Sequence, residues 1–255
     1  MRVVIALLAS LLLVGSAVAA DIAKGPNVVE GTPTVYQNTL TRADFLVVSI
    51  IQGTFTDMGP TWVTALGSAD LMYDPAGVYP DLSGYQMILV DTADMWWSYS
   101  FAADESAWTT YHANGGCVFV VGQDYLYSRG STAGFPMTVL GMASVSQDVA
   151  YDTTTIEWYG VGILDGLSGV LTACFASNGF FSDNVTPAEA GIAEWSDEMG
   201  AGGEAGCTAA NAGLSTIEFG CGPDVAAVAA AFVGHCGGVI PTENTSWGQI
   251  KSIFE

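Results

Sequence analysis

The chain has 255 residues and a formal net charge of −21 at pH 7. Its length suits one large α/β domain with a buried core. A surface this acidic repels phosphate groups, which excludes nucleic acids as partners and disfavours anionic membrane surfaces.

The first twenty residues have the pattern of a secretory signal peptide. Arg2 precedes an apolar run from Val3 to Val14, and small residues follow in "GSAVAA". The run is shorter than the ~18 apolar residues of a membrane span, and no later stretch reaches that length. An uncleaved N-terminal anchor is the alternative. We expect residues 1–20 to be removed, leaving a secreted, periplasmic or cell-surface protein without an integral membrane segment.

Three continuous apolar runs of strand length lie at residues 43–50, 85–92 and 117–123. Runs that are apolar on both faces are typical of the centre of a parallel sheet covered by helices. Residues 21–42, which precede them, form either an added edge strand or a linker.

Two helices are expected between these runs. "TDMGPTWVTALGSA" has Pro60 near its start, and "ADESAWTTYHANGG" has Asp104 as a potential cap and a stop at Asn114. A short strand in "ADLMYDPAG" completes a β-α-β-β-α-β order. This order predicts one α/β domain over residues 43–240, with a doubly wound, mostly parallel open sheet.

The pattern changes after Gly130. "ASVSQDVAYDTTTIEWYG" reads as two extended pieces, and a flexible glycine-rich loop is expected before a C-terminal β-hairpin. A closing helix is expected at residues 224–238. The tail at 241–255 ends in a short amphipathic piece, which either folds back on its own domain or docks on a protein partner.

The five cysteines suit an exported protein with disulfides, and they are Cys117, Cys174, Cys207, Cys221 and Cys236. The segment "GCTAANAGLSTIEFGC" predicts a hairpin centred near Leu214. Such a hairpin would bring Cys207 opposite Cys221, so we expect these two to pair. Cys117 is expected to be a small buried side chain in its strand, and the partners of the remaining cysteines stay open. No Cys/His spacing indicates zinc.

The segments "DLSGYQMILVDT", "DESAWTTYHANGG" and "CVFVVGQDYLY" together resemble class I glutamine amidotransferase-like domains, which have a flavodoxin-like fold. The similarity is greatest to secreted bacterial versions, including the trehalose-utilisation type. It covers residues 44–130 well and the remainder loosely.

The catalytic residues of that family have no counterpart here. Amidotransferase activity implies a cysteine at the turn after the third apolar run, where this chain has Gly122, Gln123 and Asp124. Cys117 lies at the other end of that run, about 16 Å away at the rise of a strand. The family's histidine is followed two residues later by glutamate, but His235 is followed by Cys236 and a glycine. The sequence therefore predicts no catalytic residues of the amidotransferase type.

In doubly wound sheets, ligands bind beyond the carboxyl ends of the strands. The candidate ligand-binding residues there are Asp91, Asp94, Trp96, Trp97, Gln123, Asp124, Tyr125 and Arg129. Aromatic faces pack on sugar rings, while carboxylates and amides bind hydroxyl groups. This favours a carbohydrate or another small polar ligand.

The alternative is purely structural. In it the two tryptophans cover the sheet edge, the two aspartates at 91 and 124 cap turns, and Arg129 pairs with one of them. The segments "DTAD" and "SDNVTPAE" carry carboxylates that could bind calcium, but neither has the ligand series of an EF-hand. The sequence therefore predicts no metal site and no cofactor.

The leading hypothesis is an exported, acidic, bacterial-type member of the amidotransferase-like fold without catalytic activity, which serves as a binding or surface-structural module. The alternative is an extracellular hydrolase that acts on a polar substrate through the carboxylates at the strand ends. An open pocket shared by Asp91, Asp124 and Arg129 would favour the hydrolase, and mutual hydrogen bonds without a cavity would favour the module.

Overall fold

The computed structural model describes residues 35–36, 43–54, 56–95, 99–149, 151–176 and 179–238. All of these belong to one compact unit, residues 33–255. The expected signal peptide (1–20), the tail (241–255) and most of segment 21–42 lie outside the described residues. Within the described ranges, no helix combines the length and the apolar character needed to cross a membrane.

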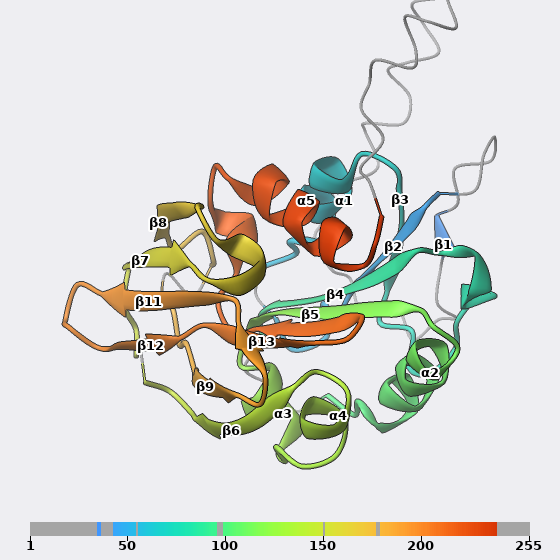
Figure 1. The fold of residues 1–255 in the computed structure, drawn as a ribbon, viewed down its shortest axis with the longest axis horizontal. Helices are drawn as coiled ribbons and strands as arrows, with labels where there is room; N and C mark the ends of the chain where they lie inside the picture. Colours follow the sequence, from blue (N-terminus) through green and yellow to red (C-terminus); the bar gives the residue numbers. More distant parts are fainter. Residues whose placement is uncertain are drawn as a thin grey trace, which may run out of the picture. The chain divides into compact units, whose positions relative to one another are not determined.

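An eight-stranded sheet lies at the centre of this unit (Figure 1). Its strands, in order across the sheet, are β1 (Val35–Tyr36), β3 (Ala69–Tyr73), β2 (Phe45–Ser49), β4 (Met87–Asp94), β5 (Cys117–Gln123), β14 (Ala212–Ser215), β13 (Gly206–Ala209) and β10 (Ala190–Gly191). The five strands from β3 to β14 run parallel, and the others add antiparallel edges. This is the strand order of flavodoxin-like folds, and it confirms the predicted mostly parallel α/β sheet.

The three predicted apolar runs form the central strands β2, β4 and β5, which are buried along their whole length. Successive side chains of a strand point to opposite faces, so Leu46 and Val47 enter different hydrophobic cores. Helices cover both faces (Figure 1), with α1 (Gly59–Leu66) and α5 (Val225–His235) on one side and α2 (Ala102–Ala113), α3 (Tyr125–Arg129) and α4 (Phe135–Thr138) on the other.

Aromatic stacking joins the first of these helical layers to the sheet. The ring of Phe232 in α5 lies 4.3 Å from that of Phe119 in β5 and 6.1 Å from that of Trp62 in α1. All three side chains are fully buried. Burial of each contributes roughly 1.5–3 kcal/mol, so this stack anchors both helices.

A second, antiparallel sheet lies between β5 and β14 in the sequence and was not predicted. Its strands are β12 (Gly202–Glu204), β11 (Ala193–Asp197), β7 (Thr155–Gly160) and β8 (Ser168–Thr172), while β6 (Met142–Ser146) and β9 (Asn184–Pro187) form a separate pair. Short 3-10 helices complete the fold at η1 (Leu82–Gly84), η2 (Gly162–Leu164) and η3 (Phe219–Cys221). The glycine-rich segment expected to be a loop contains β12 and the start of β13.

The structure contains two disulfides, Cys117–Cys236 and Cys174–Cys221. Cys207 is buried and free, so the predicted Cys207–Cys221 bond is wrong. The antiparallel pair of β13 and β14 turns at residues 210–211, which places Cys207 opposite Leu214. Cys221 lies beyond the pair, in η3. The expectation that Cys117 is unpaired is also wrong, because the start of β5 lies beside the end of α5, and the two Cα atoms are 5.7 Å apart.

Candidate functional site

The turn after β5 has the geometry of a sharp elbow. Asp124 has left-handed backbone angles, with φ 60° and ψ 9°, and α3 begins at the next residue. The preceding Gly122 has φ +122°, and a Cβ atom there would lie 2.5 Å from Thr92 Oγ1 and 2.6 Å from the backbone nitrogen of Ala93. Only glycine fits this approach between β5 and the irregular end of β4. The elbow thus holds Asp124 at the carboxyl edge of the sheet.

Seven carboxyl groups are linked by contacts and electrostatic interactions along this edge, and we call them the acidic rim. They are Asp57, Asp91, Asp94, Asp124, Asp148, Asp183 and Glu218. The strand order reverses between β2 and β4, where ligands bind in doubly wound folds, and Asp91 lies in β4 at that point.

Asp91 and Glu218 form a completely buried pair. Asp91 accepts a hydrogen bond from the Ala93 N–H at 2.9 Å. Glu218 accepts two, from Trp62 Nε1 at 3.0 Å and from the Gly220 N–H at 2.7 Å. These bonds hold both side chains rigidly beneath the edge.

Burial raises the pKa of Asp91 well above its usual range, and the neighbouring charge of Glu218 adds to this effect. Burial also raises the pKa of Glu218 to about 7. Glu218 Oε2 is buried without a hydrogen-bond partner among the described residues. Because the pKa values of both neighbouring carboxyl groups are raised, the pair shares one proton near neutral pH.

The neighbouring carboxylates of the rim are bonded to local groups. Asp57 accepts hydrogen bonds from Ser49 Oγ at 2.9 Å and from the Tyr73 hydroxyl at 2.8 Å. Asp94 accepts one from the Thr56 N–H at 3.0 Å and lies beside Gln123 across the β4–β5 ladder. These contacts order the loop between β2 and α1.

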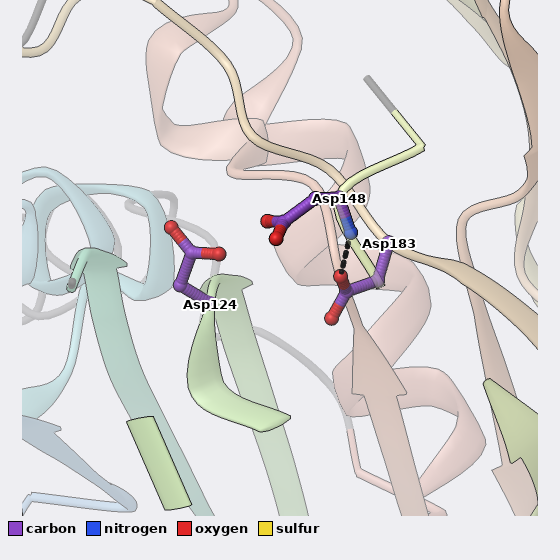
Figure 2. A group of neighbouring side chains, drawn as sticks. All are labelled: Asp124, Asp148 and Asp183. Atoms are coloured by element: carbon purple, nitrogen blue, oxygen red, sulfur yellow. Dashed lines mark hydrogen bonds between the residues drawn. The ribbon is translucent and has the colours of Figure 1, made fainter. Parts of the chain in front are cut away.

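Asp124, Asp148 and Asp183 form an aspartate cluster at one end of the rim (Figure 2). One carboxylate oxygen from each lies within 4.8 Å of the other two. Asp148 follows β6 and Asp183 precedes β9, so the paired strands β6 and β9 bring both to the elbow. Gln123 Oε1 holds this segment by accepting a hydrogen bond from the Phe181 N–H at 3.1 Å.

The carboxyl group of Asp183 is completely buried, but only one of its two oxygens has a hydrogen-bond partner among the described residues. Its Oδ1 accepts a hydrogen bond from the Asp148 N–H at 2.9 Å, drawn as a dashed line in Figure 2. Its Oδ2 is buried and has no hydrogen-bond partner among the described residues. An unpartnered buried carboxylate oxygen is unusual because its desolvation is uncompensated.

Burial is the main cause of the raised pKa values in the aspartate cluster. The pKa of Asp124 rises to about 8, with further contributions from the negative charges of Asp183 and Asp148. The pKa of Asp183 rises to about 7, although the hydrogen bond from the Asp148 N–H partly opposes the effect. Asp148 itself is exposed.

Arg129 does not pair with the acidic rim. Its guanidinium forms a two-point ion pair with Glu105 of α2, with one contact of 2.8 Å from Nη2 to Oε2. The Tyr125 hydroxyl donates to the same carboxylate at 2.7 Å. The alternative in which Arg129 pairs with Asp91 or Asp124 is therefore wrong, because α3 turns both Tyr125 and Arg129 toward α2.

Of the residues predicted from sequence, Asp91, Asp94, Gln123 and Asp124 gather at the rim, whereas Tyr125 and Arg129 belong to the contact between α3 and α2. Trp96 and Trp97 lie outside the described residues. Sequence reasoning missed Asp148, Asp183 and Glu218 as members of this site. The one usable signal is "SDNVTPAE", which contains Asp183 and carries carboxylates suited to calcium.

The two histidines serve a different part of the fold. His112 Nε2 lies 2.9 Å from the carbonyl oxygen of Ala210, and His235 Nε2 lies 2.8 Å from that of Ala209. One thus bonds to the turn between β13 and β14, and the other bonds to the last residue of β13.

A cavity of about 440 Å³ lies between residues 77–83 and α2, and none of the rim residues lines it.

No protein-family model matches the chain, and no curated protein matches it either. Among solved structures, the crystal structure of a protein from Bacteroides uniformis described as ThuA-like aligns with a TM-score of 0.48 at 12% sequence identity. The alignment covers 82% of this chain and 95% of that chain.

Proposed function

We propose that the chain is an exported binding module that takes a small polar ligand at the acidic rim. The observation that carries this proposal is the charge balance of the rim. Arg129 is the one lysine or arginine among the described residues, and Glu105 occupies its guanidinium. The rim carboxylates therefore have no basic side chain of the described fold to neutralise them.

This charge balance determines which chemical classes of ligand the rim favours. Phosphates, sulfates and carboxylates are repelled, because no described cation is available to bind them at the rim. Groups that donate hydrogen bonds or carry positive charge are favoured instead. Polyhydroxyl compounds such as carbohydrates belong to the first class, and metal cations belong to the second.

The same features argue against covalent catalysis at the elbow. A carboxyl group acts as a nucleophile only when ionised, and the pKa of Asp124, about 8, keeps it largely protonated at neutral pH. The raised pKa values of Asp91 and Glu218 favour a hydrolase instead, since a protonated carboxyl group would suit a general acid. Both side chains are fully buried, however, so a substrate cannot reach that proton without rearrangement of the edge.

The disulfides support the assignment to an oxidising compartment. Cys117–Cys236 and Cys174–Cys221 use four of the five cysteines, and such bonds persist outside the cytoplasm. The signal-peptide pattern of residues 1–20 points to the same location.

Binding of residues 21–255 to glycan and metabolite arrays tests the proposal. Asp124→Asn should lose the binding that the unmodified protein shows, because it removes the carboxylate at the elbow. Asp165→Asn is a matched control, since Asp165 is exposed and lies next to η2. No binding by the unmodified protein, or equal loss in both variants, would contradict a rim site. Turnover of an array compound that Asp91→Asn abolishes would favour the hydrolase.

A further inference from the structure

The geometry of the aspartate cluster points to a metal ion. Three carboxylate oxygens that lie within 4.8 Å of one another converge from three separate segments of the chain. In Figure 2 the carboxyl groups of Asp124 and Asp148 point toward each other, and that of Asp183 extends from its backbone toward Asp124. Like charges do not gather in this way unless something neutralises them.

The buried oxygen of Asp183 is the independent observation. Asp183 has no exposed surface, and its Oδ2 lacks a hydrogen-bond partner among the described residues. Its other oxygen is bonded to the backbone of Asp148, which fixes the carboxyl group in place. A cation between the three side chains would give Oδ2 the partner that the described protein groups do not supply.

We propose that Asp124, Asp148 and Asp183 bind a calcium ion at the acidic rim. This inference rests on the proposed function and deepens it, because it names a chemical class of ligand for the same rim. It also revises the expectation from sequence that the chain has no metal site.

The oxygen donors and their spacing select calcium. Carboxylate oxygens bind hard cations, and the cluster has no sulfur or imidazole ligand that would favour zinc. Ca²⁺ takes oxygen ligands at about 2.3–2.6 Å in flexible geometry, so oxygens up to about 4.6–5.2 Å apart fit one ion. Mg²⁺ requires about 2.0–2.1 Å and a near-ideal octahedron and retains several of its waters, so three carboxylates from separate segments suit it less well than they suit Ca²⁺.

A bound ion would join two parts of the fold. Asp124 belongs to the elbow after β5, whereas Asp148 and Asp183 belong to the segments that flank the β6–β9 pair. The direct contact between these parts includes the Gln123–Phe181 hydrogen bond. Calcium would add a charged cross-link at this junction, and a polar ligand of the rim could then coordinate the same ion.

Calorimetric titration of the metal-free protein, residues 21–255, with CaCl₂ tests the inference. The titration is done at pH 8.5, above the pKa values of about 8 for Asp124 and about 7 for Asp183. We expect one ion per chain and a rise in the melting temperature with calcium. Asp148→Asn should weaken binding at least tenfold without unfolding the protein, because Asp148 is exposed. Asp165→Asn should leave the affinity unchanged.

Three results would overturn the inference. The first is no binding heat together with no change in melting temperature. The second is equal weakening by Asp148→Asn and Asp165→Asn, which would mean that calcium only screens the acidic surface. The third is binding of MgCl₂ as tight as that of CaCl₂.

Repeating the array experiment with calcium and with a chelator separates the two proposals. Ligand binding that persists in chelator, with no calcium binding, supports the module and contradicts the calcium site. Calcium binding without any array ligand supports the calcium site and contradicts a module for small organic ligands. Ligand binding that requires calcium supports both.

Discussion

Two buried acidic side chains beside helix α3, Glu105 and Asp124, have opposite surroundings. Glu105 forms an ion pair with Arg129, the last residue of α3, and accepts a hydrogen bond from the hydroxyl of Tyr125, the first residue. Asp124 directly precedes α3 and lies among other carboxyl groups, and burial raises its pKa to about 8. Among the described residues, Glu105 therefore has a basic partner and Asp124 does not.

The difference distinguishes carboxylates that the fold itself satisfies from carboxylates that it leaves without a basic partner. A carboxylate with two donors and a guanidinium is satisfied by the fold and needs no ligand. A carboxylate that is buried beside others is neutral by protonation or by a bound cation. The aspartate cluster belongs to the second kind, and each of the following experiments acts on carboxyl groups of one kind.

Removal of the Arg129 guanidinium should have the largest effect on stability. Arg129→Met leaves Glu105 without its ion-pair partner in a largely buried position, which should lower the free energy of unfolding by about 3 kcal/mol. Urea denaturation measures this loss. The double variant Glu105→Gln, Arg129→Met should recover most of it, because no unpaired charge remains. A loss below about 1 kcal/mol in the single variant would mean that the pair is solvated and contributes little.

A smaller effect on stability is expected from ionisation within the buried pair of Asp91 and Glu218. The pKa of Glu218 is about 7 in the folded protein, above its ordinary value of 4.5, so folding takes up a proton between these values. The contribution of Glu218 to stability should therefore be complete below about pH 4.5, be lost as the pH rises to about 7, and change little above that pH.

The variant Glu218→Gln tests this dependence of stability on pH. The amide keeps an oxygen for Trp62 and Gly220 but cannot ionise. The variant should be more stable than the unmodified protein by about 2 kcal/mol at pH 8 and nearly equal to it at pH 5. Urea denaturation across this pH range measures both values, and parallel pH profiles for the two proteins would contradict the shared proton.

The smallest effect is expected at the elbow itself. In the presence of a chelator, Asp124→Asn removes one of three clustered carboxyl groups and should raise the free energy of unfolding by about 1 kcal/mol at pH 8.5. With calcium present, the variant should be the less stable of the two proteins, because it loses a ligand of the ion. Thermal unfolding with and without calcium compares these conditions. If the variant is the more stable protein both with and without calcium, Asp124 interacts with its neighbours but not with the ion.

The sequence predicted the central sheet because its strands follow a simple rule. The runs that became β2, β4 and β5 are apolar at successive positions, and strands buried on both faces require that pattern. Asp91, Asp94, Gln123 and Asp124 were assigned to the rim for the same reason, since parallel strands end at one edge.

The remainder of the site depends on pairings that the sequence does not reveal. Asp148 and Asp183 reach the elbow only because β6 pairs with β9, about forty residues later in the chain. Arg129 was assigned to the wrong partner because its direction depends on the five-residue helix α3, which turns it toward α2. The cysteine pairing failed because the antiparallel turn lies three residues before the position that symmetry between Cys207 and Cys221 suggested.

The two disulfides are nested, since Cys174–Cys221 lies inside the interval closed by Cys117–Cys236. Asp124, Asp148, Asp183 and Glu218 all lie in that interval. A protease that cuts the chain once anywhere between Cys117 and Cys236 therefore leaves a single covalent molecule, with these four carboxyl groups still attached to it. Nicking of an exposed loop in this interval would therefore give two fragments on a reducing gel and leave the mass almost unaltered on a non-reducing one.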